Sequence, residues 1–550
     1  MRRDEVNIGD AQLGIPTPVQ SSRGGTGMAK DASGDGQMSE LFKLNQVLYR
    51  LPATLSLVSK RTMLRQNFQQ TSYPNVANTT MQCVFNTGEF YVAPRTSFLV
   101  IQVGYTAPIT NAGGGGGGRN VINAYMGPGN VTSLFEEPTF TSASGTEICR
   151  EQNKGLQQTH VLYNKYNYTY IQKNGALQGF PLTTMTSFSN AGQTTNNPAL
   201  VDDPPLGLVE LNNNGPQTFI IPMSQVLGLF DPYMSLLIPA GLLAGANFLL
   251  RLKNLQESLI YGGPGTVNAD GATAFAIPYT TNFSVTGIYF MLDAFQLNDA
   301  VLKRLNQVAA GEDGMAFMFD TFDNSLVSNA QVGATEIQVQ QARSRISRSF
   351  CIVRDLDTVT NPYVPSLCSE SLFANTGYGA YPTTDATLNR YVALGPNVAG
   401  NAPNVISYQA QLGSLFFPQQ PLGTQYREEF WMNQLYVWLK GMTDELATNT
   451  IGFLEFFGAR GISWNAGRII PGQNAGAFSF PFGLAQFGML AERSQLLQLS
   501  GLPISNARLL RHKFTFGQAT ASGLPRQIDC FTQFTRVVKV FLGGRVVVRE

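Results

Sequence analysis

The chain has 550 residues, of which 43% are hydrophobic and only 13% are charged, and its formal net charge is +1. Typical soluble chains carry about 25% charged residues, so we expect much of this surface to be covered by neighbouring subunits. A net charge so close to zero provides no overall electrostatic attraction to polyanions. Because all-β domains often reach about 200–250 residues, the length fits two large domains as well as three ordinary ones.

The first 65 residues differ in composition from the rest. Residues 1–36 are polar and rich in Gly, Ser and Asp, which predicts a flexible arm. Ser39 can serve as a helix N-cap, and apolar residues recur at helical spacing up to Pro52. The segment 41–65 has no acidic residue, and its basic residues are Lys43, Arg50, Lys60, Arg61 and Arg65. It predicts either a short basic amphipathic helix packed on the body or an arm facing an anionic surface, such as a membrane or nucleic acid.

From Thr80 the pattern becomes that of strands. Residues 98–103 are apolar on both faces, which predicts a buried strand. The glycine run Gly113–Gly118 predicts a mobile loop, and because it lacks a following Gly-Lys-Ser/Thr it does not predict a phosphate-binding loop. Residues 131–166 predict a strand, a Ser-Gly turn and a helix, and a long polar insertion follows at about 172–216.

A stretch of about thirty residues occurs twice, at 219–252 and at 478–511. Each copy reads as an apolar strand with a proline at its end, a short helical segment, a glycine turn and a strand ending in Leu-Leu-Arg. The matched pairs are Pro222 with Pro481, Gly241 with Gly501, Asn247 with Asn506 and Arg251 with Arg511. Two copies are too few for a solenoid. They predict a duplicated domain, with a first unit over 66–265 and a second over 266–550.

The second unit is also expected to be mostly strands. Residues 274–295 and 334–355 are strand-like, although the centre of the latter, QARSR, could form a helix. The loop-rich region 355–405 predicts a large surface excursion. Residues 406–439 read as a strand, a proline turn and a helix, in which Trp431 and Trp438 share a face that fits the core or a subunit interface. Gly543-Gly544 predicts a hairpin near the end. The fold class is all-β.

Few residues suggest chemistry. Neither histidine, His160 or His512, lies in a metal-binding or nucleophile motif, and both are interpreted as structural. Neighbouring residues of a strand point to opposite faces, so the acidic doublets are poor candidates for a glycosidase pair. These doublets are Glu136-Glu137, Asp202-Asp203 and Glu428-Glu429. We predict no catalytic residue, no cofactor, no metal ligand and no enzyme activity.

Two further groups of residues are given structural interpretations. The cysteines form no CxxC pair, which predicts neither a zinc site nor a disulfide framework but buried thiols in a reducing compartment. They are Cys83, Cys149, Cys351, Cys368 and Cys530. The N-terminus has no apolar segment typical of a secretory signal.

Basic residues alternate with valines near the C-terminus and predict a solvated edge strand. They are Arg536, Lys539, Arg545 and Arg549.

Taken in order, these motifs resemble the double jelly-roll major capsid proteins of tailless icosahedral double-stranded DNA viruses. That lineage includes adenovirus hexon, virophages, polinton-like viruses and the nucleocytoplasmic large DNA viruses, and the chain is most similar to the polinton-like virus and virophage proteins. The resemblance rests on segments 85–103, 133–166 and 219–252 of the first unit, and on 408–435 and 478–516 of the second.

The resemblance implies two consecutive eight-stranded jelly-roll sandwiches with short helices and long loops. It implies a structural capsid protein of the virion, assembled inside the host cell (cytoplasm or nucleus), whose homotrimers are pseudo-hexameric and tile an icosahedral shell. The implied partners are other copies, minor capsid and penton proteins, and an internal membrane or the genome through the N-terminal arm, with no small-molecule substrate. Loops near 104–130, 185–215 and 355–405 would face outward or lie between subunits, and segment 41–65 would lie on the inner side.

Two alternatives stay open. Another virion structural protein, such as a penton or spike component, more usually carries one jelly roll, so the internal duplication argues against it. A carbohydrate-binding β-sandwich protein would be expected to have a signal peptide and disulfides, which the sequence does not suggest.

Overall fold

The structure is a computed structural model of the 550-residue chain. It describes residues 57–73, 79–105, 123–126, 130–166, 170, 173–174, 177–179, 210–211, 216–231, 237–253, 259–262, 283–330, 333–339, 341–355, 405–423, 487–491, 501–505, 508–516 and 526–549. The helix predicted before Pro52, the glycine run, most of the loop region 355–405 and the tryptophan-containing helix lie outside these ranges.

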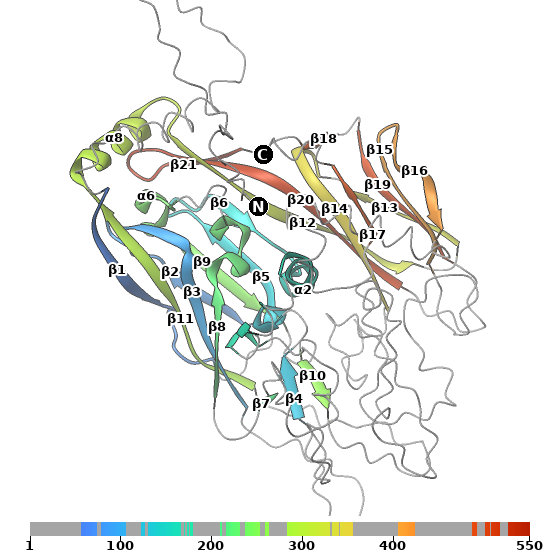
Figure 1. Ribbon diagram of the computed structural model, residues 1–550, viewed down its shortest axis with the longest axis horizontal. Coiled ribbons are helices and arrows are strands. Elements are labelled where there is room, and N and C mark those ends of the chain that lie inside the picture. Colours follow the sequence, from blue (N-terminus) through green and yellow to red (C-terminus); the bar gives the residue numbers. More distant parts are fainter. Residues whose placement is uncertain are drawn as a thin grey trace, which may run out of the picture. The chain divides into compact units, whose positions relative to one another are not determined.

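Two four-stranded antiparallel sheets, built mainly from the first half of the chain, form what we call the first sandwich (Figure 1). One sheet has the order β1 (Val58–Asn67), β11 (Phe283–Leu297), β3 (Tyr91–Tyr105), β8 (Gln217–Pro222). The other has the order β2 (Thr80–Val84), β9 (Asn247–Leu252), β5 (Phe135–Thr141), β6 (Glu147–Arg150).

The core of the first sandwich is aromatic. Five fully buried phenylalanines pack with ring centroids 5.3–6.4 Å apart, within the range of favourable edge and offset contacts. They are Phe85, Phe140, Phe230, Phe248 and Phe290. They come from both sheets and from the segment after β8, because strands with apolar residues at every second position present them all to one face.

A second sandwich repeats this arrangement. One sheet has the order β12 (Met315–Ala330), β20 (Arg526–Val540), β14 (Arg343–Asp355), β17 (Phe487–Leu490), with β18 (Leu502–Ile504) on β14 and β21 (Val546–Arg549) on β20. The facing sheet has the order β13 (Gly333–Val339), β19 (Leu510–Phe516), β15 (Val405–Leu412), β16 (Leu415–Gly423). Both sheets contribute to one buried cluster.

The duplicated stretches occupy corresponding places in the two sandwiches. In the first copy, β8 pairs with β3, and β9 lies between β2 and β5. Between these strands run α5 (Met223–Val226), the 3₁₀ turn η3 (Gly228–Phe230) and α6 (Ala240–Leu243). In the second copy, β17 pairs with β14, and β19 lies between β13 and β15. The predicted order of strand, short helix, turn and strand is therefore confirmed for the first copy. In the second copy the residues matched with β8 lie outside the described residues and β17 begins after them, so the strand pairing repeats at matched positions only where β19 overlaps the residues matched with β9.

The predicted unit boundaries differ from the sheet boundaries. β1 begins at Val58, inside the segment expected to be arm and helix, and pairs with β11. β11 was expected to open the second unit, but it lies between β1 and β3 of the first sandwich. In each sandwich the last strand pairs with the first and third strands of the same sandwich. These partners are far from it in sequence, so the local sequence pattern does not indicate to which unit the last strand belongs.

Helices and turns connect the strands. α2 (Lys154–Lys165) forms where the sequence predicts a helix, whereas the possible helix in QARSR is wrong because Arg343 begins β14. The sequence did not predict α8 (Asp299–Ala310), which links β11 to β12 and is capped by the Asn298 side chain accepting a hydrogen bond from the Ala300 amide. Gly543 and Gly544 have positive φ and form the predicted hairpin turn before β21.

A small third sheet joins three short strands, of which β4 and β7 lie in regions predicted as loops. Its order is β10 (Leu259–Gly262), β4 (Asn123–Met126), β7 (Glu210–Leu211). Among the helices in the described ranges, none is long and apolar enough to cross a membrane.

Candidate functional site

The residues matched in the duplication have structural roles where the structure describes them. Pro222 ends β8, and Asn247 begins β9, where its side-chain oxygen accepts a hydrogen bond from Gln82 at 3.0 Å. A Cβ at Gly501 would collide with the carbonyl oxygen of Ile346, so this position requires glycine. Gly241 lies in α6 with room for a side chain. Pro481 and Asn506 lie outside the described residues.

The two matched arginines each join neighbouring strands. Arg251 on β9 contacts Glu137 on β5 at 2.8 Å, and Arg511 on β19 contacts Glu336 on β13 at 3.3 Å. Their side chains are 44% and 40% exposed, and ion pairs this exposed contribute about 0–1 kcal/mol. The repeated arginine is therefore a sheet-surface feature.

The basic residues of the predicted inner-face segment that the structure describes lie on β1. Lys60, Arg61 and Arg65 are exposed there, and Lys43 and Arg50 lie outside the described residues. The Arg61 guanidinium donates two hydrogen bonds, of 2.9 and 2.8 Å, to the buried carboxylate of Asp293. Burial by itself would raise the pKa of Asp293, but the hydrogen bonds from Arg61 and Thr96 outweigh it, and the pKa lies below its ordinary value.

The interpretation of the C-terminal basic residues is wrong for two of the four. Arg536 and Lys539 lie on β20, which is a central strand between β12 and β14, and they are 7% and 4% exposed. Arg536 donates a hydrogen bond to the carbonyl oxygen of Ile148. Alternation of charge with valine predicted a solvated face, but the face that carries Arg536 packs against the first sandwich. Lys539 lies on the opposite face of β20, where its ammonium contacts Asp313 at 3.3 Å. Arg545 and Arg549, at the β21 hairpin, are exposed as expected.

A polar cluster joins the two sandwiches, and we call it the junction cluster: Glu151, Lys154, Gly228 and Thr321. The Glu151 carboxylate is 1% exposed. It accepts hydrogen bonds from the Gly228 amide at 3.0 Å, the Thr321 hydroxyl at 3.1 Å and the Lys154 ammonium at 2.5 Å. Glu151 and Lys154 follow β6 and Gly228 begins η3, whereas Thr321 lies on β12. One carboxylate therefore ties the two sandwiches together.

Packing around the junction cluster is equally close. A Cβ at Gly228 would collide with the carbonyl oxygen of Asp320 on β12. Helix α2, which precedes β8 in the chain, contributes Leu156, Val161 and Leu162 to the buried cluster of the second sandwich. The sequence contains no signal for this junction, since a Glu and a Lys three residues apart are common on exposed helices.

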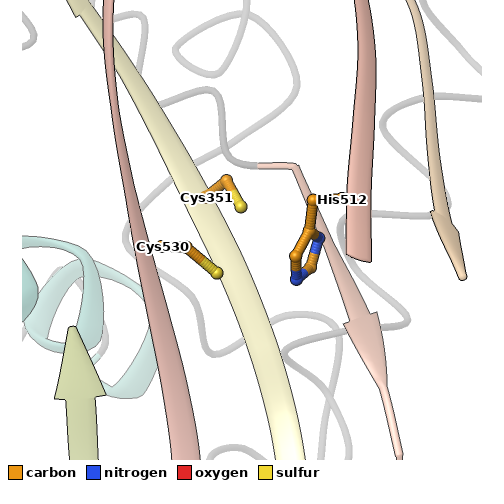
Figure 2. Close-up of side chains that lie close together, drawn as sticks. All are labelled: Cys351, His512 and Cys530. Carbon is orange, nitrogen blue, oxygen red and sulfur yellow. The ribbon is translucent and has the colours of Figure 1, made fainter. Parts of the chain in front are cut away.

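Three chemically reactive side chains meet inside the second sandwich (Figure 2). Cys351 on β14 and Cys530 on β20 are direct cross-strand partners, and His512 reaches them from β19 of the facing sheet. All three residues are buried, and their ligand atoms lie within 4.8 Å of one another. We call this set the thiol–imidazole cluster. The sequence led us to interpret His512 as a structural residue, and the neighbours that it meets here could not be predicted from sequence.

Hydroxyl groups surround the cluster. The Ser349 hydroxyl lies 2.9 Å from Nε2 of His512 and 3.4 Å from Sγ of Cys530, and the Tyr408 hydroxyl lies 2.8 Å from Nδ1 of His512. Burial raises the pKa of the Cys351 thiol well above its ordinary value. Burial also opposes ionisation of Cys530, but its hydrogen bond with Cys351 and the neighbouring His512 outweigh this and lower the pKa of Cys530.

No family model matches the sequence, and no curated protein matches it. Solved structures match almost the whole chain. A quasi-atomic model of the PBCV-1 virus capsid has a TM-score of 0.51 at 10% identity and covers 91% of this chain and 99% of that chain. The Sputnik virophage structure has a TM-score of 0.53 at 9% identity, with 91% and 90% covered. The Faustovirus major capsid protein has a TM-score of 0.50 at 9% identity, with 93% and 100% covered.

The chain is a double jelly roll. In both sandwiches the first, eighth, third and sixth strands form one sheet, and the second, seventh, fourth and fifth form the other, which is the eight-stranded arrangement of a jelly roll. The predicted fold class is thus confirmed. Identity near 10% establishes the fold and nothing finer.

The acidic doublet Glu136-Glu137, which lies within the described residues, forms ion pairs. Glu136 and Glu137 on β5 both contact Arg251, at 3.8 and 2.8 Å, and Glu137 also pairs with Arg150. Both carboxylates are thus held by basic side chains of the sheet surface. Asp202-Asp203 and Glu428-Glu429 lie outside the described residues. The contacts of Glu136-Glu137 are therefore those of an ion-pair network on the sheet surface.

Proposed function

We propose that this chain is a major capsid protein whose homotrimers form pseudo-hexameric capsomers of an icosahedral viral shell, without enzymatic activity. The observation that carries the proposal is the strand-by-strand repetition of one sandwich within the chain. Three copies of a chain with two similar sandwiches present six similar units, which suits tiling by hexagons. The whole-length similarity to capsid proteins of PBCV-1 and Faustovirus supports the same function.

The surface composition supports self-association. Only 13% of residues are charged. Several large apolar side chains in the described ranges are exposed, and Leu415 and Phe416, at 44% and 40%, are neighbours at the hairpin joining β15 to β16. Burial of apolar area contributes about 25 cal/mol per Å², so a large interface between copies would be stable without a cofactor. Cyclic threefold symmetry would close such an interface into a discrete trimer.

The finer parts of the proposal concern location and partners. We propose that the basic segment 41–65 faces the interior of the shell, toward a membrane or the genome, and that penton and minor capsid proteins contact the trimers. The exposed Lys60 on the edge strand β1 supports this orientation, because a basic edge suits an anionic surface. Assembly would take place inside the host cell.

The test is the mass of the purified full chain by light scattering over a dilution series, followed by negative-stain microscopy. The proposal predicts a species of about three times 59.8 kDa that persists on dilution and has a hexagonal outline. A monomer at all concentrations would contradict it. A glycan array on the same sample serves as the comparison, because specific sugar binding by a monomer would favour the carbohydrate-binding alternative.

A further inference from the structure

The thiol–imidazole cluster brings together three donors that zinc prefers. Thiolate sulfur and imidazole nitrogen are the usual ligands of zinc in proteins. The three donors come from β14, β20 and β19, so they span both sheets of the second sandwich. Sequence spacing did not reveal them, because Cys351, His512 and Cys530 belong to no short motif and meet only through the strand order.

The separations within the cluster are close to those of a tetrahedral zinc centre. Zinc–ligand bonds of about 2.0–2.3 Å place neighbouring ligand atoms about 3.3–3.8 Å apart. The Ser349 oxygen lies 2.9 Å from the imidazole nitrogen and 3.4 Å from the Cys530 sulfur. The three ligand atoms of Cys351, His512 and Cys530 lie within 4.8 Å of one another. A contraction of about 1 Å would complete the centre, with the Ser349 oxygen or a water beside it in the fourth position.

The surroundings of His512 fit a zinc ligand. A ligating histidine normally donates its second ring N–H to an oxygen acceptor, which fixes the ring and its tautomer. The Tyr408 hydroxyl, 2.8 Å from Nδ1, can accept that hydrogen bond, so that Nε2, which now lies 2.9 Å from the Ser349 hydroxyl, would be the nitrogen that binds the metal. Figure 2 shows the ring of His512 beside both cysteine side chains.

Charge balance also favours zinc. The cluster is fully buried, with Cys351, Cys530 and His512 each 0% exposed. An isolated charge at such a place is costly. Two thiolates and one Zn²⁺ have a total charge of zero, and on binding the two thiol protons leave to solvent. A divalent ion held by uncharged donors alone would not be neutralised.

We propose that Cys351, Cys530 and His512 bind one structural zinc ion that fastens the two sheets of the second sandwich. This site is independent of the proposed capsid function, because it concerns the fold of one chain. Since such a site is not preformed in the unfolded chain, zinc binding would add to the free energy of unfolding.

The first experiment measures zinc in the full chain, expressed with zinc and purified under reducing conditions, by elemental mass spectrometry. We expect about one zinc per chain, and background levels in Cys351→Ser and Cys530→Ser. Cys83→Ser is the matched control: Cys83 is equally buried but lies in the first sandwich, and this variant should keep its zinc. Equal zinc content in all four proteins would overturn the proposal.

A second experiment needs no variant. Wild-type protein produced with Co²⁺ in place of zinc should show the visible absorption of tetrahedral cobalt and a thiolate-to-cobalt charge-transfer band. Its thermal midpoint should exceed that of the metal-free protein. The absence of both bound zinc and these bands, or a disulfide between Cys351 and Cys530 found by peptide mapping, would show that the cluster binds no metal and would overturn the proposal.

Discussion

Removal of the Glu151 carboxylate tests whether the junction cluster holds the two jelly rolls together. In Glu151→Ala, the Gly228 amide and the Thr321 hydroxyl lose their acceptor, and the ammonium of Lys154 is left without the carboxylate it contacts at 2.5 Å. The side chains of Glu151 and Lys154 are 1% and 3% exposed. Breaking a buried ion pair by removing one partner costs about 3–5 kcal/mol, because the remaining charge is buried without compensation.

This cost should be measured as a change in thermal midpoint. At about 2 °C per kcal/mol for a domain of this size, Glu151→Ala should lower the midpoint by about 6–10 °C. Glu336→Ala is the matched control, since the Glu336 side chain and that of its partner Arg511, 3.3 Å away, are 37% and 40% exposed. Exposed pairs of this kind contribute about 0–1 kcal/mol, so the control should lose about 2 °C at most.

A double variant separates the charge from the packing. Glu151→Gln with Lys154→Met removes both charges and keeps similar volumes, so it should be more stable than Glu151→Ala. If Glu151→Ala melts within about 2 °C of the wild type, or if the double variant is the less stable of the two, then the reasoning about a buried ion pair at the junction is wrong.

Two further predictions follow from single contacts. Gly228→Ala should cost about 1–3 kcal/mol of stability, because the new Cβ collides with the backbone of Asp320. Gly241→Ala should leave the thermal midpoint nearly unchanged, because its Cβ would lie 3.6 Å from the Val540 side chain. Equal midpoints in the two variants would contradict this prediction. The low pKa of Asp293 stabilises the fold above the ordinary aspartate pKa of about 4, and this contribution is lost as pH falls through the lower pKa of the folded state. Arg61→Ala should therefore be less stable than the wild type at neutral pH, and the two melting curves should converge in acid; a difference that is independent of pH would refute this role of Arg61.

Local pattern determined the fold class and the duplication. In strands such as β19, LRHKFTF, the residues Arg, Lys and Thr recur at every second position between more buried residues, and this alternation is a property of the segment itself. The Gly543-Gly544 turn and the helix α2 were predictable for the same reason. The repeated closing stretch indicated two similar units before any pairing was known.

Pairing across long separations decided the rest. β11 belongs to the first jelly roll because it lies between β1 and β3, about 190–230 residues earlier in the chain. The burial of Arg536 depends on the first jelly roll covering β20. Cys351, His512 and Cys530 meet because β14, β20 and β19 are neighbours across a sandwich. Hydrophobic periodicity records which face of a strand is buried, but it carries no information about which strand or sheet covers that face.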